Sequence, residues 1–190
     1  MERIKELLNH ESKYKLDPET IDKLLDMAVP VYFRRGQIVF DEGSVDKDIY
    51  ILKEGIVAYT YMDGSNERCY AFAQPATIIY SSASYLMNET SFYRVSACCD
   101  TVMLRISKQD FDLMIDSFPE FARFILGVTM NQLYLIERKN ILINGNSAER
   151  FRMVIKNRPE IVRHVTSKLI ASYLGITQQH LCRLKKKLLQ

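Results

Sequence analysis

Residues 166–190 read Thr166-Ser-Lys-Leu-Ile-Ala-Ser-Tyr-Leu-Gly-Ile-Thr-Gln-Gln-His-Leu-Cys-Arg-Leu-Lys-Lys-Lys-Leu-Leu-Gln190. This stretch predicts two helices on either side of a turn at Gly175, because leucine and isoleucine recur at three- and four-residue spacing. A threonine precedes each helix, Thr166 and Thr177, where its hydroxyl oxygen can accept from free backbone amides. Small Ala171 allows a close helix crossing, and a glycine suits a turn that needs positive φ. The spacing is typical of a helix-turn-helix, whose second helix enters the major groove of DNA.

The second of these helices begins with polar side chains that can reach base edges. Arg183 is the first candidate, because a guanidinium can donate two hydrogen bonds to guanine O6 and N7. The two glutamines are candidates for adenine or for phosphate, and the histidine is a weaker one. Serine and lysine side chains beside them are expected to contact phosphates. The predicted DNA-binding residues are Ser167, Lys168, Thr177, Gln178, Gln179, His180, Arg183, Lys185 and Lys187.

Charge is distributed unevenly along the chain. The whole sequence has 26 lysines and arginines against 23 aspartates and glutamates, a formal net charge of +3. Residues 148–190 hold ten of the basic residues and two of the acidic ones, a net +8, which leaves −5 for the remainder. A basic end on an acidic body favours a module that binds a polyanion. The alternative is an ordinary helical hairpin with a solvated face, which would more often mix the two signs.

Composition excludes several classes of protein. Hydrophobic residues make up 47% of the chain, which is ordinary for a globular protein, and no apolar run is long enough to cross a bilayer. We therefore expect a cytoplasmic protein with no membrane partner. The four cysteines form no CxxC pair and the three histidines have no ligand spacing, so buried free thiols are expected and no metal site or cofactor. Without a nucleophile–base pair or a phosphate-binding glycine loop, the sequence does not predict an enzyme.

The middle of the chain predicts a small β-structure between helical segments. Residues 1–30 have helical apolar spacing, with Asp17 as a cap and Pro18 in the first turn. Short segments rich in β-branched and aromatic residues then follow one another closely, separated by glycine turns, which is typical of a small barrel or roll. The predicted strands are 31–33, 37–40, 49–53, 56–61, 68–73, 77–80, 93–97 and 101–106.

Helix is predicted again after the strands. Ser107 is placed to cap one helix, and Pro119 begins a long helix over about 120–143 whose apolar residues cover most of its circumference. Such a helix needs two surfaces, which would be the roll and the same helix of a second subunit. The alternative is burial in a single core. Asn144-Gly145-Asn146 is predicted to be a hinge, followed by a helix that Ser147 caps and that ends at Asn157-Arg-Pro159.

Several motifs resemble those of one family in the same order along the chain. They are Arg34-Arg-Gly-Gln-Ile-Val-Phe-Asp-Glu-Gly43, Asp48-Ile-Tyr-Ile-Leu-Lys-Glu-Gly55, Ala148-Glu-Arg-Phe151 and the C-terminal helix-turn-helix. Together they resemble the cyclic-AMP receptor protein and fumarate-nitrate regulator (CRP/FNR) family of bacterial transcription factors. The resemblance implies an α+β fold: an N-terminal double-stranded β-helix, or cyclic-nucleotide-binding-like β-roll, with flanking helices (1–118), a dimerisation helix and hinge (119–146), and a helix-turn-helix DNA-binding domain (147–190). It also implies a homodimer on double-stranded DNA, with RNA polymerase as a candidate partner.

The sequence departs from this family where cyclic nucleotides bind. Family members hold the ribose with a Gly-Glu pair and the cyclic phosphate with an Arg-Ser pair, but by spacing Tyr80-Ser81 and Ser91-Phe92 stand at these places. Without the arginine a cyclic phosphate loses its main partner, so tight binding of cyclic AMP is not expected. Hydroxyl groups could instead line a pocket for another small polar effector of unknown identity, the alternative being a partly collapsed pocket. The predicted effector residues are Tyr80, Ser81, Ser82, Ser84, Ser91 and Arg94.

Taken together, the residues and the resemblance predict a sequence-specific DNA-binding transcriptional regulator whose cyclic-nucleotide-binding-like effector domain has a degenerate phosphate cassette. The alternative is a ligand-binding regulatory module that acts through protein partners and keeps a vestigial DNA-binding end. That alternative predicts weak DNA binding without sequence preference.

Overall fold

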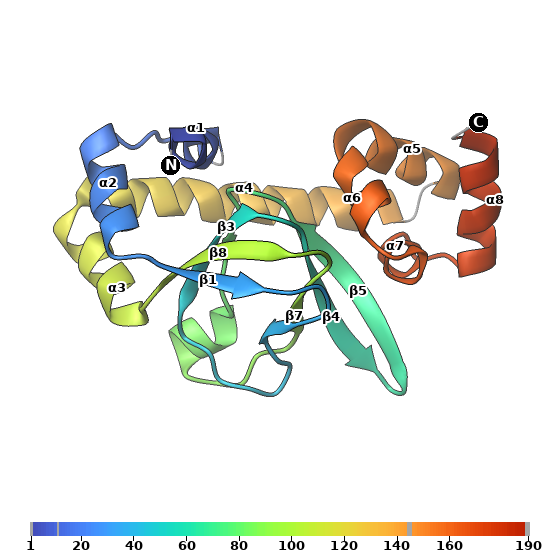
Figure 1. The fold of residues 1–190 in the computed structure, drawn as a ribbon, viewed down its shortest axis with the longest axis horizontal. Coiled ribbons are helices and arrows are strands. Elements are labelled where there is room, and N and C mark those ends of the chain that lie inside the picture. Colours follow the sequence, from blue (N-terminus) through green and yellow to red (C-terminus); the bar gives the residue numbers. More distant parts are fainter. Residues whose placement is uncertain (1, 11, 144–145, 189–190) are drawn as a thin grey trace.

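The computed structural model of the chain describes residues 2–10, 12–143 and 146–188. Two helices, α1 (Glu2–His10) and α2 (Pro18–Asp26), open the fold. Asp17 caps α2 as predicted, because its carboxylate accepts from the Thr20 amide at 2.9 Å and Pro18 occupies the first turn. Both helices lie along one end of a much longer helix (Figure 1).

Within the described residues, eight strands form two four-stranded antiparallel sheets that face each other. The sheet orders are β1-β8-β3-β6 and β2-β7-β4-β5. Side chains from both sheets fill the space between them, including Leu52, Val57 and Met103. Each of these eight strands overlaps one predicted segment, so the β-roll prediction is confirmed. The strands are β1 (Val29–Phe33), β2 (Ile38–Phe40), β3 (Ile49–Glu54), β4 (Val57–Asp63), β5 (Asn66–Ala73), β6 (Ile78–Ile79), β7 (Arg94–Ala97) and β8 (Thr101–Ile106).

Alternation along β3 shows how the first sheet is buried on both faces. Tyr50 and Leu52 point into the roll, whereas Ile49 and Ile51 point outward into a second core shared with the helices. The turn between β3 and β4 requires Gly55, whose φ is +99° and where an added Cβ would lie 2.9 Å from the Asp100 carbonyl oxygen. This turn brings the two sheets together.

The long helix, α4 (Pro119–Ile143), runs behind the roll and links the N-terminal helices to the C-terminal helices (Figure 1). It follows α3 (Lys108–Ser117), which Ser107 caps as predicted by accepting from the Asp110 amide. Phe121, Phe124 and Val128 of α4 are buried in the core formed with α1 and α2. Its first half therefore has one buried face. No helix of the described segments is both long and apolar enough to cross a lipid bilayer.

Four short helices form the C-terminal unit (residues 146–188). They are α5 (Ser147–Asn157), α6 (Pro159–His164), α7 (Ser167–Tyr173) and α8 (Gln178–Leu188). The predicted hinge lies partly outside the described residues, since only Asn146 of its three is described. The prediction that Ser147 caps α5 is wrong. Asn146 is the cap, accepting from the Ala148 amide at 2.9 Å, while the Ser147 hydroxyl lies 2.9 Å from the His180 ring.

Candidate nucleic-acid interface and effector pocket

Helix α8 has one buried face and one exposed face. Leu181 and Leu184 are buried against the other C-terminal helices. Thr177 caps the helix as predicted, accepting from the His180 amide at 3.2 Å, and Gly175 takes a φ of +66° in the preceding turn. This turn fixes the direction in which α8 leaves α7, and therefore which of its side chains face solvent.

The exposed face of α8 carries the polar and basic side chains. Gln179, Arg183 and Lys186 are exposed and follow one another at four- and three-residue spacing, which places them on one side of the helix. Cys182 is also exposed between them, so the expectation of a buried thiol is wrong at this position. The sequence interpretation did not include Lys186, although the helical period counted from Arg183 would have found it.

The remaining predicted residues of α8 lie toward the sides of this face. Gln178 and Lys187 are exposed, whereas His180 is partly buried beside Ser147 of α5. The Lys185 amine donates to the Ser167 hydroxyl at 2.9 Å, so this lysine connects the end of α8 with the start of α7. The structure thus brings the predicted serine and lysine together at one edge of the helix pair.

Helix α7 is packed against the outer edge of the roll. The Ser172 hydroxyl accepts from the Cys69 amide of β5 at 2.8 Å, and the Tyr173 ring lies 5.1 Å from that of Phe72. Lys168, a predicted phosphate contact, pairs with Glu67 of β5 at 3.8 Å. None of these contacts was predicted, because the partners are about a hundred residues apart in the chain.

A lysine of α4 lies where α7 and β5 meet. The Lys139 amine is 4.6 Å from the centre of the Tyr173 ring and 5.8 Å from that of Tyr70, and it donates to the Tyr70 carbonyl. Burial lowers the pKa of this amine, yet the two rings present their negative faces to a cation. The residue carries no distinguishing signal in the sequence.

An apolar cluster, termed here the junction cluster, joins the C-terminal unit to the roll. Phe151 and Val154 of α5 pack in it against buried residues of α7 and α8. Its other members come from both parts of the chain. The buried residues of the junction cluster are Ile56, Ala58, Cys69, Phe72, Cys98, Phe151, Val154, Ile161, Val165, Ile170, Ala171, Leu174, Leu181 and Leu184.

The predicted effector serines are mostly buried and bonded within the protein. Ser81, Ser84 and Ser91 are buried, while Ser82 is exposed at the start of a π-helical turn, η1 (Ala83–Met87). The Ser84 hydroxyl donates to the Ser81 hydroxyl at 3.1 Å, and the Ser91 hydroxyl donates to the Tyr93 carbonyl at 2.8 Å. The structure therefore brings Ser81 and Ser84 together and gives the buried hydroxyl groups of Ser81, Ser84 and Ser91 partners within the protein.

Arg94, the cation nearest the altered cassette, already has a partner. Its guanidinium donates twice to Asp41, from Nε at 2.7 Å and from an Nη at 3.1 Å. These charge-assisted hydrogen bonds hold the pKa of Asp41 below its usual range. A ligand phosphate at this point would have to compete with that carboxylate.

Tyrosine rings occupy the side of the roll next to these residues. The ring centres of Tyr59, Tyr70 and Tyr93 are 5.4–5.5 Å apart from one another, and the Tyr93 hydroxyl donates to the Tyr80 carbonyl at 2.7 Å. Burial raises the pKa of Tyr93 to about 12. These phenols are therefore neutral at physiological pH and offer a ligand no charge.

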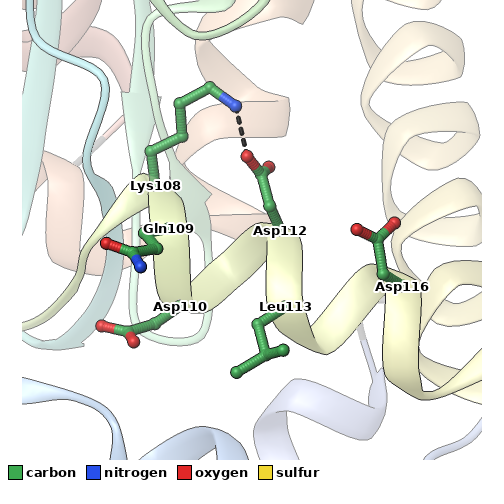
Figure 2. Close-up of a pocket in the computed structure, with 6 residues that line it drawn as sticks. All are labelled: Lys108, Gln109, Asp110, Asp112, Leu113 and Asp116. Atoms are coloured by element: carbon green, nitrogen blue, oxygen red, sulfur yellow. Dashed lines mark hydrogen bonds and ion pairs between the residues drawn. The ribbon is translucent and has the colours of Figure 1, made fainter.

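A hollow of a different character lies on α3, at the opposite end of the molecule from α8 (Figure 1). Figure 2 shows the Lys108 amine bridging to Asp112, with Asp116 one turn further along the helix. The hollow is open and rich in carboxylates, so it is unsuited to a polyanion. Its lining residues are Lys108, Gln109, Asp110, Asp112, Leu113 and Asp116.

Comparisons with known proteins agree with this architecture. Residues 30–118 match a family model described as the cyclic nucleotide-binding domain. The regulator CLP of Xanthomonas campestris has 17% identity over 90% of this chain and 91% of its own, with a TM-score of 0.72. FixK2 of Bradyrhizobium japonicum has 18% identity over 85% of this chain and 84% of its own, with a TM-score of 0.71. The catabolite activator protein of Thermus thermophilus has 19% identity over 91% and 84%, with a TM-score of 0.59. No curated sequence matches the chain. The shared property is the α+β cyclic nucleotide-binding fold.

Proposed function

We propose that this chain is a CRP/FNR-type transcriptional regulator that binds DNA through the exposed face of α8. The observation that carries the proposal is the arrangement of Gln179, Arg183 and Lys186 on one exposed face, with leucines anchoring the other. A helix of this kind fits the major groove and offers donors to base edges. The C-terminal unit that holds α8 has a net charge of +8, which favours binding to the phosphates of a polyanion such as DNA.

Within this face we assign different tasks to different residues. Arg183 reads guanine, and Gln178 and Gln179 read adenine or bind phosphate. Lys185 with Ser167, together with Lys168, Lys186 and Lys187, would neutralise the DNA backbone. Thr177 supports the start of α8 as its cap, and His180 lies to the side, where it is a weaker candidate for a base.

We further propose a homodimer formed along α4. Leu126, Met130 and Leu133 expose 54%, 60% and 55% of their surfaces, and their four- and three-residue spacing makes one stripe. An exposed apolar stripe on a helix of this length favours pairing with the same helix of a second copy. Two copies would present two α8 helices to half-sites about one turn of DNA apart. The roll (1–118), the helix and hinge (119–146) and the DNA-binding domain (147–190) would then be the three functional parts.

Cyclic AMP is not the effector in this proposal. The buried serines already have protein partners, and Arg94 is held by Asp41. Arg94 carries the only guanidinium among the predicted effector residues. A cyclic phosphate could bind it only by displacing the Asp41 carboxylate. We therefore expect DNA binding without added ligand. We also propose that the protein acts in the cytoplasm, with RNA polymerase as a candidate partner.

The decisive experiment is selection of bound duplexes from a random DNA pool, followed by affinity measurements on the selected sequence. Arg183→Ala should weaken binding to that sequence about 5- to 150-fold, equivalent to about 1–3 kcal/mol, and relax one base pair in each half-site. Arg152→Ala removes the same charge from an exposed residue of α5 and is the matched control. It should leave the ratio of specific to non-specific affinity unchanged. An unchanged ratio for Arg183→Ala refutes its role, and recovery of no motif favours the module that acts through protein partners.

A further inference from the structure

Strand β5 is the outer strand of its sheet, and α7 covers part of its free edge. The sheet order β2-β7-β4-β5 leaves one side of β5 without a neighbouring strand. On that side the Cys69 amide donates to the Ser172 hydroxyl of α7 at 2.8 Å. An edge amide needs such a partner when water is excluded. Helix α7 is therefore docked on the roll by a specific polar contact as well as by the junction cluster.

A second contact at the same edge involves a residue of the proposed DNA interface. Glu67 lies two residues before Cys69, so the side chains of these two residues lie on the same face of the sheet. Its carboxylate is 3.8 Å from the Lys168 amine. The side chains are 32% and 67% exposed, which leaves the ion pair open to water and to a competing anion. The pair is thus weak enough to be exchanged.

We propose that Glu67 is a built-in competitor of the DNA backbone. While α7 is docked on β5, the Glu67 carboxylate pairs with the Lys168 amine, which is the group that a DNA phosphate would bind. DNA binding must therefore displace Glu67 from Lys168. This inference rests on the proposed function, since it assigns a regulation to the same helix pair. Because DNA binding must displace Glu67, a change that weakens the docking of α7 on β5 without altering a DNA-contacting side chain should strengthen DNA binding, by at most the factor by which docking is weakened.

The contacts around α7 also connect this competition to the long helix. The Tyr173 ring of α7 lies beside both Lys139 of α4, at 4.6 Å from the amine, and the Phe72 ring of β5, at 5.1 Å between ring centres, so that two elements hold α7 in place. A rearrangement of α4 would thus alter the position of Lys168 relative to Glu67. The sensor part and the DNA-binding part are coupled here through contacts that need no ligand.

The test measures the affinity of the full chain for a random-sequence DNA duplex, by fluorescence anisotropy at low and at near-physiological potassium chloride. Glu67→Gln should tighten binding about three- to fivefold, the factor that corresponds to losing a competing surface ion pair. Glu89→Gln, at an exposed carboxylate between η1 and β7, removes the same charge and should have a much smaller effect because salt screens distant charges. Equal effects of the two variants would overturn the inference.

Two further variants separate competition from charge. In a Lys168→Gln background the effect of Glu67→Gln should disappear, and its persistence would overturn the proposal. Ser172→Ala removes the hydrogen bond to Cys69 without changing charge, so it should also tighten binding, and an unchanged affinity would contradict the role of docking. If the wild type binds DNA and Glu67→Gln does not change the affinity, only this inference is overturned. Absence of binding by the wild type and every variant at low salt overturns the proposed function as well.

Discussion

Replacing Leu133 by glutamate tests the proposed pairing of α4 helices most directly. Leu133 lies in the exposed stripe with Leu126 and Met130, on the face opposite the buried Phe124 and Val128. A charge there leaves the protomer's own core untouched. In a dimer, the same charge would enter an apolar interface and face its copy. The substitution therefore separates pairing from folding.

The expected cost follows from the exposed fraction of this side chain. Full burial of a leucine contributes about 1.5–3 kcal/mol, and Leu133 has 55% of its surface left to bury. Each protomer would lose about 1 kcal/mol of burial, or about 2 kcal/mol per dimer. Desolvating two carboxylates adds at least about 1 kcal/mol each. The total of about 4 kcal/mol weakens the dimer about a thousandfold.

Sedimentation equilibrium over a range of protein concentrations measures this change. The wild type should sediment as a dimer and Leu133→Glu as a monomer, with unchanged far-ultraviolet circular dichroism. Leu113→Glu is the matched control, because Leu113 of α3 is 52% exposed and lies outside the stripe. It should remain a dimer. A monomeric wild type, or a dimeric Leu133→Glu, would refute the assignment of this face.

Two other expectations concern stability. Gly127→Ala should destabilise the fold by about 1–3 kcal/mol in chemical denaturation, because the new Cβ would lie 2.1 Å from the Ser12 hydroxyl and 3.0 Å from the Tyr14 ring, a clash that outweighs the gain in helix propensity. In a Ser12→Gly background only the milder Tyr14 contact remains, so most of the cost should disappear, and an undiminished cost there would contradict the steric explanation. Asp41 has a lowered pKa because of Arg94, so this pair stabilises the fold above the ordinary aspartate pKa of about 4 and loses its effect as pH falls through the lowered value. The gain is below about 1 kcal/mol because the pair is 40% exposed. Nuclear magnetic resonance titration should show the Asp41 pKa returning toward its ordinary value in Arg94→Ala, and no change in that titration would count against the pair.

Local signals explain why most of the fold was predictable. Asp17, Ser107, Thr166 and Thr177 each cap a helix through a partner three residues away, so the sequence alone contains both halves of the interaction. Strands could be found from their β-branched and aromatic runs. The wrong cap at Ser147 shows the limit of such signals, because neighbouring Asn146 competes for the same amides and His180 lies beside the serine.

Long-range partners explain what was not predictable. Whether Arg94 faces a ligand depends on Asp41, which is 53 residues earlier in the chain. The docking of α7 depends on Cys69 and Ser172, which are 103 residues apart. No periodicity relates such pairs, so only the folded chain reveals them. The exposed face of α8 is different, since the helical period already contained Lys186.

The junction cluster has a consequence for how this chain can be divided. Its members Ile56, Phe72 and Cys98 belong to the roll, yet they are covered by Phe151 and other residues that follow residue 146. A fragment that ended before α5 would expose these side chains as an apolar patch next to the uncovered edge of β5, a combination that favours aggregation. The roll is therefore not a separable module, and the two parts should melt in one transition. Fragment work and fusion designs need to keep the C-terminal helices attached.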